Sequence, residues 1–293
     1  MTHLEVAVPP IPDPAATPTV NGHGWLGRNR ISAAAEILAV AGAGGMTRLP
    51  VLASQVPLVL RRTPEAVYLV GGAAGPIGGD QLTLRISVGP GASLRVRTAA
   101  ASIALPGPGG LESALRVMID VAAGARLEYL PEPLVVSAGA RHATIIRATV
   151  ADGGSLIVRD EFLLGRHGET GGASRTELQV SYAGRPLLRQ SLEVSGTDQA
   201  DRGPAVLAGH RAAGTLLQVG PELTERPADL VSPVDDKAAA DKPGAHPPSV
   251  AAMPLAGPGI LITALADDAV TLRRNLSATP STRTRALGTR TGT

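Results

Sequence analysis

The sequence contains no cysteine, which excludes disulfides, thiolate metal sites and cysteine nucleophiles together. Aromatic residues make up only 2% of the chain, too few for a platform on which bases could stack, so we expect no nucleic-acid partner. No apolar stretch reaches the ~20 residues that span a bilayer. The N-terminus lacks the basic region and apolar run of a secretory signal. We therefore expect a cytoplasmic protein with no membrane partner.

Motifs of common enzyme classes are also missing. None of the six histidines forms a His-x-His or His-Glu-x-x-His pair, which argues against a fixed catalytic zinc. The sequence has neither the Gly-Lys-Ser or Gly-Lys-Thr of a phosphate-binding loop nor a Gly-x-Ser-x-Gly segment around a nucleophilic serine. We expect no catalytic residues and no tightly bound cofactor.

The hydrophobic fraction of 44% is enough to build a real core. A start rich in Pro, Ala and Thr indicates a disordered lead, and a later stretch rich in Pro and Ala indicates a linker or surface insertion. We therefore expect five parts. They are a lead (1–25), a β-rich core domain (26–226), a Pro/Ala-rich linker or insertion (227–252), a strand and helix that pack on the core (253–278), and a basic tail (279–293).

Alternation of apolar and polar residues dominates the middle of the chain. Between residues 82 and 88, aliphatic residues alternate with Thr83, Arg85 and Ser87, and a Gly-Pro-Gly turn follows. Such a period of two places one strand face on a core and the other in water. Five more segments are predicted as strands: 94–97, 115–119, 126–130, 143–150 and 156–164. The sequence therefore predicts a mainly β protein.

A short helix is predicted near the C-terminus, after a strand over residues 260–262. Asp267 or Asp268 can cap its first turn, because an aspartate at this position accepts hydrogen bonds from free backbone amides. Leu272 and Leu276 fall on one side of this helix, the side expected to pack on the β core.

Two carboxylates stand out from this pattern. Asp80 ends a Gly-rich loop that begins at Gly71, where a turn aspartate ordinarily binds nearby backbone amides. Asp160 lies in the strand 156–164 on a face that is otherwise apolar, so it should be buried. A buried carboxylate is costly unless it is paired or sits beside water or a metal. Asp160 therefore either pairs with an arginine of a neighbouring strand or lines a water-filled passage.

Four segments, in the same order, resemble motifs of the UreD/UreH family of urease accessory proteins. They are a Gly-rich loop with Gly72, Gly78, Gly79 and Asp80; a small-residue stretch with Thr98; a Leu-Glu-Tyr-Leu-Pro-x-Pro segment with Pro131 and Pro133; and a Gly-Arg loop with Gly165, Arg166 and Glu169. The first loop is one residue longer than the family pattern. Residues 102–105 lack the lysine and the aromatic residue that the family usually has there.

The resemblance implies a β-helix-like or stacked-sheet scaffold with about two short helices, one near the C-terminus. It also implies a non-enzymatic urease maturation factor that bridges apo-urease, a UreF-like accessory protein and a UreG-like GTPase that carries nickel. In that family, metal is thought to travel through a tunnel lined by carboxylates. Ni²⁺ would then be a transient ligand, and the resemblance makes Asp80, Asp160 and Glu169 its candidate ligands.

Oxygen ligands suit such transit, because softer or multi-histidine sites hold Ni²⁺ too tightly for it to move on. Two alternatives stay open from the residues alone. One is a β-rich hydrolase that uses buried carboxylates, and the other is a β-sheet adaptor whose function is independent of metal.

Overall fold

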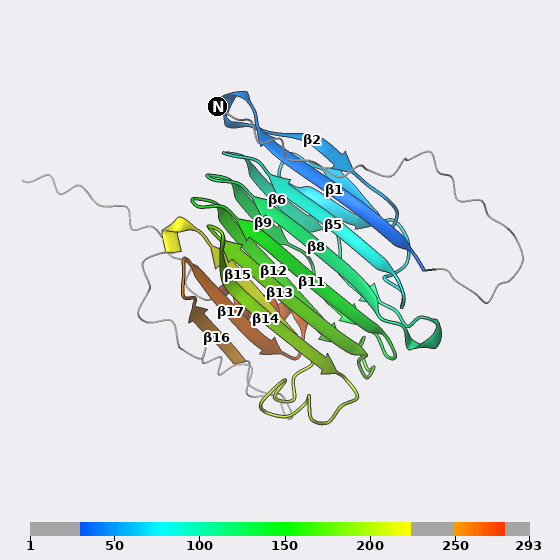
Figure 1. The fold of residues 1–293 in the computed structure, drawn as a ribbon. Helices are drawn as coiled ribbons and strands as arrows, with labels where there is room; N and C mark the ends of the chain where they lie inside the picture. The colour runs from blue at the N-terminus through cyan, green and yellow to red at the C-terminus, as the bar shows by residue number, and fades with distance from the viewer. Residues whose placement is uncertain (1–29, 224–248, 279–293) are drawn as a thin grey trace, which may run out of the picture.

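The computed structural model describes residues 30–223 and 249–278, which form two β-sheets packed across a common core. Figure 1 shows the long strands lying side by side, with the N-terminal part of the chain at one end of the array and the C-terminal part at the other. The first sheet has the strand order β14-β13-β11-β8-β5-β1-β2. Its strands are β1 (Ser32–Ala41), β2 (Thr47–Ala53), β5 (Gln81–Val88), β8 (Ser113–Val121), β11 (Arg141–Val150), β13 (Ala173–Tyr182) and β14 (Arg185–Ser195).

The second sheet has the strand order β16-β17-β15-β12-β9-β6-β4-β3, and the short strands β7 and β10 continue it beside β12. Its strands are β3 (Leu58–Arg62), β4 (Val67–Gly71), β6 (Ser93–Thr98), β7 (Ser102–Ala104), β9 (Arg126–Leu130), β10 (Leu134–Val136), β12 (Ser155–Leu164), β15 (Ala212–Val219), β16 (Ser249–Pro254) and β17 (Gly259–Ala266).

The chain winds between the two sheets as a β-solenoid of about four turns. In successive turns β5 is followed by β6, β8 by β9, and β11 by β12. Equivalent strands of neighbouring turns pair in parallel. The tight turns that join the sheets also stack, since the N–H of Arg126 donates to the carbonyl of Ala92 and that of Ser155 to the carbonyl of Ala125. The prediction of a mainly β, stacked-sheet scaffold is confirmed.

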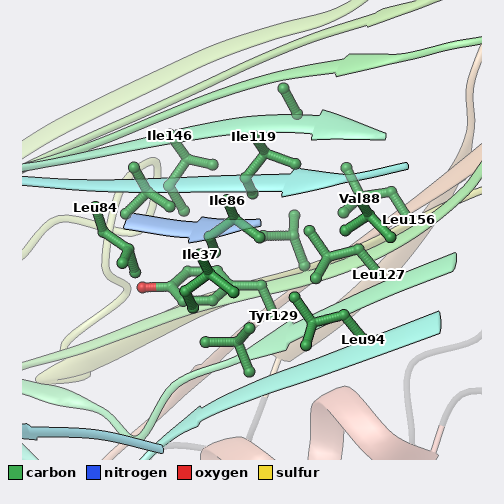
Figure 2. Packing of buried hydrophobic residues seen from close by; sticks show 14 of the residues in the cluster. Ile37, Leu84, Ile86, Val88, Leu94, Ile119, Leu127, Tyr129, Ile146 and Leu156 are labelled. Carbon is green, nitrogen blue, oxygen red and sulfur yellow. The ribbon is translucent and has the colours of Figure 1, made fainter. Parts of the chain in front are cut away.

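Parallel pairing in register arranges the inward side chains in rows. One row of the first sheet consists of Leu84, Val117 and Ile146, and the facing sheet has a row of Leu94, Leu127 and Leu156. All six are buried, and Figure 2 shows how side chains of both sheets meet in this core. Because full burial of such a side chain is worth about 1.5–3 kcal/mol, these rows are what hold the sheets together.

All six predicted central strands are confirmed, and so is the C-terminal helix, α1 (Ala269–Ala278). The Asp268 carboxylate caps this helix by accepting the backbone N–H of Thr271 at 2.8 Å. Leu272 and Leu276 are buried in a cluster with strands of the second sheet. The described ranges contain this one α-helix and three 3₁₀ helices, η1 (Ala43–Gly45), η2 (Pro108–Gly110) and η3 (Pro221–Leu223).

Three of the predicted parts fall wholly or largely outside the described residues. These are the lead (1–25), the basic tail (279–293) and most of the linker (227–252), of which the last four residues belong to β16. Within residues 30–223 and 249–278, no helix combines the length and the apolar character needed to cross a membrane.

Two loops approach each other closely at Gly78 and Gly107. A Cβ atom added at Gly78 would lie 2.5 Å from the carbonyl oxygen of Leu111, and one added at Gly107 would lie 2.1 Å from the carbonyl oxygen of Gly78. These neighbours are backbone atoms and cannot rotate away, so both positions require glycine.

Gly78→Ala should lower the free energy of unfolding by about 3 kcal/mol, because overpacking here can be relieved only by moving backbone. Gly71→Ala is the matched control, since a Cβ there would have no neighbour closer than 3.8 Å. Urea unfolding followed by circular dichroism measures both variants. Equal midpoints for the two would contradict the close contact between the loops.

Candidate functional site

Asp160 lies where two cavities meet the same strand. Its side chain belongs to the wall of a cavity of about 310 Å³, here called the threonine cavity, which Thr176, Thr215 and Thr263 also line. It also belongs to the wall of a cavity of about 490 Å³, here called the histidine cavity, which Tyr129 and His142 also line. The alternation along β12 therefore turns Asp160 toward the interior, as the sequence predicts.

The Asp160 carboxylate has no hydrogen-bond or ion-pair partner within the described residues, so the predicted arginine partner is not found there. Part of its surface is not covered by protein atoms, and the residue lines both cavities. Burial, with a smaller contribution from the negative charge of Glu161, raises the pKa of Asp160 to about 7. The carboxylate is thus close to half ionised near neutral pH.

The neighbours of Asp160 in the strand point to the opposite face of the sheet, and their charges are paired. Glu161 is 3% exposed and accepts a hydrogen bond from the Arg273 guanidinium of α1 at 2.7 Å. Arg159 lies 3.3 Å from the same carboxylate and donates to the carbonyl of Pro131 at 2.8 Å. Arg273 also donates to Glu132 at 2.8 Å. This network joins α1 to the strand that carries Asp160.

Asp80 is buried and bound by two backbone amides. One carboxylate oxygen accepts the N–H of Ile31, and the other accepts the N–H of Ile77, both at 2.9 Å. Gly79, just before it, has a φ of +100°, a conformation that residues with a side chain rarely adopt. The N–H of Gly72 donates to the carbonyl of Pro57 at 2.8 Å. Asp80 therefore has the contacts of a turn aspartate and is not among the residues that line either cavity.

Glu169 closes the predicted Gly-Arg loop through Arg166. Its two oxygens accept three hydrogen bonds from the backbone N–H and the guanidinium of Arg166, at 2.8–2.9 Å. These bonds, chiefly those from the guanidinium, lower the pKa of Glu169 to about 2. The loop is fixed to the solenoid by Gly165, whose N–H donates to the carbonyl of Val136 at 2.7 Å. Arg166 itself lines the histidine cavity.

The other motif residues meet at the edge of the histidine cavity. Thr98 and Pro131 both line it, and the Thr98 hydroxyl oxygen accepts the N–H of Glu132 at 2.7 Å. The carbonyl of Pro133 accepts the N–H of Ser102 at 3.1 Å. Parallel pairing of β6 with β9 therefore brings these two segments together, although they are far apart in the sequence.

Sequence reasoning missed His142, which lies on the inner face of β11 in the wall of the histidine cavity. The sequence motifs that predict a metal site require histidines close together in the sequence. His142 is an isolated histidine that shares the inward face of its strand with Thr144 and Ile146. The alternation along this strand could have predicted that His142 faces the interior. Its Nδ1 lies 2.8 Å from the hydroxyl oxygen of Ser113. Tyr129, another cavity residue, was assigned only to a strand, and Figure 2 shows it among the core side chains.

The fold and these cavities define a β-solenoid scaffold with a partly polar interior. The model of the UreD urease accessory protein family matches residues 32–291. A urease accessory protein UreD of Parafrankia sp. is 40% identical over 289 residues, which cover 90% of this chain and 93% of the relative. UreD of Streptomyces avermitilis is 41% identical over 254 residues, which cover 84% and 95%. UreD 3 of Streptomyces griseus is 43% identical over 238 residues, which cover 78% and 87%.

The chain therefore belongs to the UreD family of urease accessory proteins. Proteins of this family are non-enzymatic maturation factors that take part in nickel insertion into urease. The expectation of an accessory protein is confirmed by this membership, and the alternative of a β-rich hydrolase is set aside.

The raised pKa of Asp160 predicts how stability depends on pH. Because the folded-state pKa lies above the ordinary value, ionisation of this carboxyl opposes folding, and stability falls as pH rises from 3.8 to about 7. Asp160→Asn is neutral at every pH, so it should be more stable than the wild-type protein at about pH 8 and gain little below about pH 4. Urea midpoints at both pH values measure the difference. A difference that does not change with pH would contradict the buried, unpaired carboxylate.

Proposed function

We propose that Ni²⁺ on its way to apo-urease passes through the interior of this solenoid, with Asp160 as its principal ligand. The observation that carries the proposal is that one inward-facing carboxylate, unpaired in the part of the chain that the structure describes, forms part of the wall of two cavities. A cation moving between the cavities would meet a negative charge at the strand they share. Without a cation, the same charge destabilises the fold, and a destabilising charge in a cavity is typical of a functional residue.

The chemistry of the walls suits a ligand that must leave again. The threonine cavity offers neutral oxygen atoms, among them the buried amide oxygen of Gln190, which has no hydrogen-bond partner within the described residues. No group of three or more His, Cys, Asp or Glu side chains gathers in the described part of the chain. Scattered oxygen ligands bind Ni²⁺ weakly and exchange quickly. Binding at Asp160 would also displace its proton, which makes capture of the metal weaker at low pH.

Asp80 and Glu169 have smaller roles in this proposal. Each already accepts hydrogen bonds with both carboxylate oxygens, so a metal would have to break those bonds before it could bind. We assign Asp80 chiefly to the shape of the loop beside the histidine cavity. We assign Glu169 chiefly to the position of Arg166 at the wall of that cavity.

The proposed partners are a UreF-like accessory protein, a UreG-like GTPase that acts through the complex, and apo-urease. The exposed apolar side chains near the histidine cavity support a protein-binding role for this face. Ile103 lines the cavity and is 40% exposed, and Val56, next to the cavity residue Pro57, is 57% exposed. Solvent-exposed apolar groups at a cavity mouth favour contact with another protein.

Asp160→Ala should leave the fold and partner binding intact but lower the nickel content and activity of urease severalfold when nickel is limiting. The measurement is co-expression of the chain with apo-urease and the UreF-like and UreG-like proteins, followed by nickel analysis and a urease assay. Asp120→Ala is the matched control, because Asp120 is an exposed carboxylate on the outer face of β8.

Co-expression without the chain sets the baseline for this experiment. Urease that is fully active with Asp160→Ala at limiting nickel would refute the passage through the solenoid. Such a result, together with full dependence on the wild-type chain, would leave a metal-independent adaptor as the function.

A further inference from the structure

We propose that His142 is a second metal site of the solenoid, at which the imidazole Nε2 binds a borderline divalent cation such as Ni²⁺ inside the histidine cavity. This inference rests on the proposed passage and extends it, because it adds a nitrogen ligand to a path described so far by oxygen atoms. Three observations carry it: the placement of the ring, the hydrogen bond that fixes it, and the absence of a partner for its second nitrogen among residues 30–223 and 249–278.

The ring is enclosed by the protein but borders open space. His142 is 2% exposed and lines the same cavity as Asp160, from the opposite sheet. Thr144 and Ile146 follow it on the inner face of β11 and line the cavity as well. Polar atoms inside a protein are ordinarily paired, because an unpaired buried polar atom is costly, so the nitrogen that borders the cavity is the one available to a ligand.

Ser113 holds one of the two ring nitrogens of His142. Its hydroxyl oxygen lies 2.8 Å from Nδ1 of His142, and its hydroxyl donates to the carbonyl of Arg141 at 3.3 Å. In the proposed site, the Ser113 hydroxyl gives its one proton to the Arg141 carbonyl, and Nδ1 carries the ring proton and donates it to the Ser113 oxygen. This leaves the lone pair on Nε2, and the bond to Ser113 fixes the orientation of the ring, as second-sphere partners do for metal-binding histidines.

Nε2 is free to act as a ligand. No hydrogen bond or ion pair occupies it within the described residues. Burial, opposed only in part by the charge of Glu112, lowers the pKa of His142 to about 4, so a proton does not compete for the lone pair at neutral pH. Imidazole is a good ligand for Ni²⁺, and a single imidazole holds it far less tightly than a cluster would.

The test uses the full-length chain with His3, His23, His167 and His246 replaced by glutamine. Two histidines then remain, His142 and His210. Ni²⁺ alone is added; equilibrium dialysis measures binding, and X-ray absorption identifies the ligands. We expect imidazole nitrogen in the nickel shell. Adding His142→Gln should remove that signal and weaken binding at least about tenfold. Because His210 is present in both proteins, the difference reports His142.

Nuclear magnetic resonance of ¹⁵N-labelled histidine covers the case in which His142→Gln fails to fold. In the parent protein, His142 should be protonated at Nδ1. The resonances of His142 are identified as those that shift in the Ser113→Ala variant. Ni²⁺ should broaden the Nε2 resonance. A nickel shell without imidazole, or a ring protonated at Nε2 and untouched by Ni²⁺, would overturn the site.

The two proposals fail separately. If Asp160→Ala lowers nickel delivery but His142→Gln binds Ni²⁺ like its parent, the passage stands and the histidine site falls. If Asp160→Ala delivers nickel normally while the imidazole signal depends on His142, the histidine site stands and the passage falls.

Discussion

Parallel hydrogen bonding in register is the constraint on which the rest of this protein depends. It fixes which residue of each strand faces the interior, turn after turn, and so arranges apolar side chains in the rows of which Leu84 and Leu127 are members. A shift by one residue would turn every inward side chain of a strand to the other face. The same constraint places Asp160 and His142 inside, on strands of opposite sheets.

The carboxylates on the two faces of β12 differ in whether they have a charged partner. On the outer face, the charge of Glu161 is paired with Arg273 and Arg159 through Oε2, although its Oε1 has no hydrogen-bond partner within the described residues. On the inner face, Asp160 keeps an uncompensated carboxylate next to open space. Asp160 therefore lowers the stability of the fold, while the ion pairs of Glu161 on the outer face hold β12 and α1 together. Such a local cost is expected where a protein must bind a ligand and release it.

The sequence predicts what depends on near neighbours and misses what depends on register between distant segments. Alternation identified the strands and the inward direction of Asp160, and the spacing of Asp268 and Leu272 identified the capped helix. The Ser113–His142 pair, 29 residues apart, exists only because β8 and β11 align these residues. The hydrogen bond from Ile31 to Asp80 joins residues 49 positions apart in the sequence, and the Glu161–Arg273 pair joins residues 112 positions apart. A pattern of neighbouring residues cannot predict contacts at such separations.

The pairing of Glu161 with Arg273 also sets an order of events during synthesis. Strand β12 leaves the ribosome 112 residues before the arginine that neutralises its outer charge. Until α1 has been made, Glu161 has only Arg159 of its own strand as a charged partner among the described residues, so its burial is compensated only in part. The second sheet around Glu161 is therefore less stable while the chain is still being made. It reaches its full stability only when α1 has been synthesised and has packed on β12.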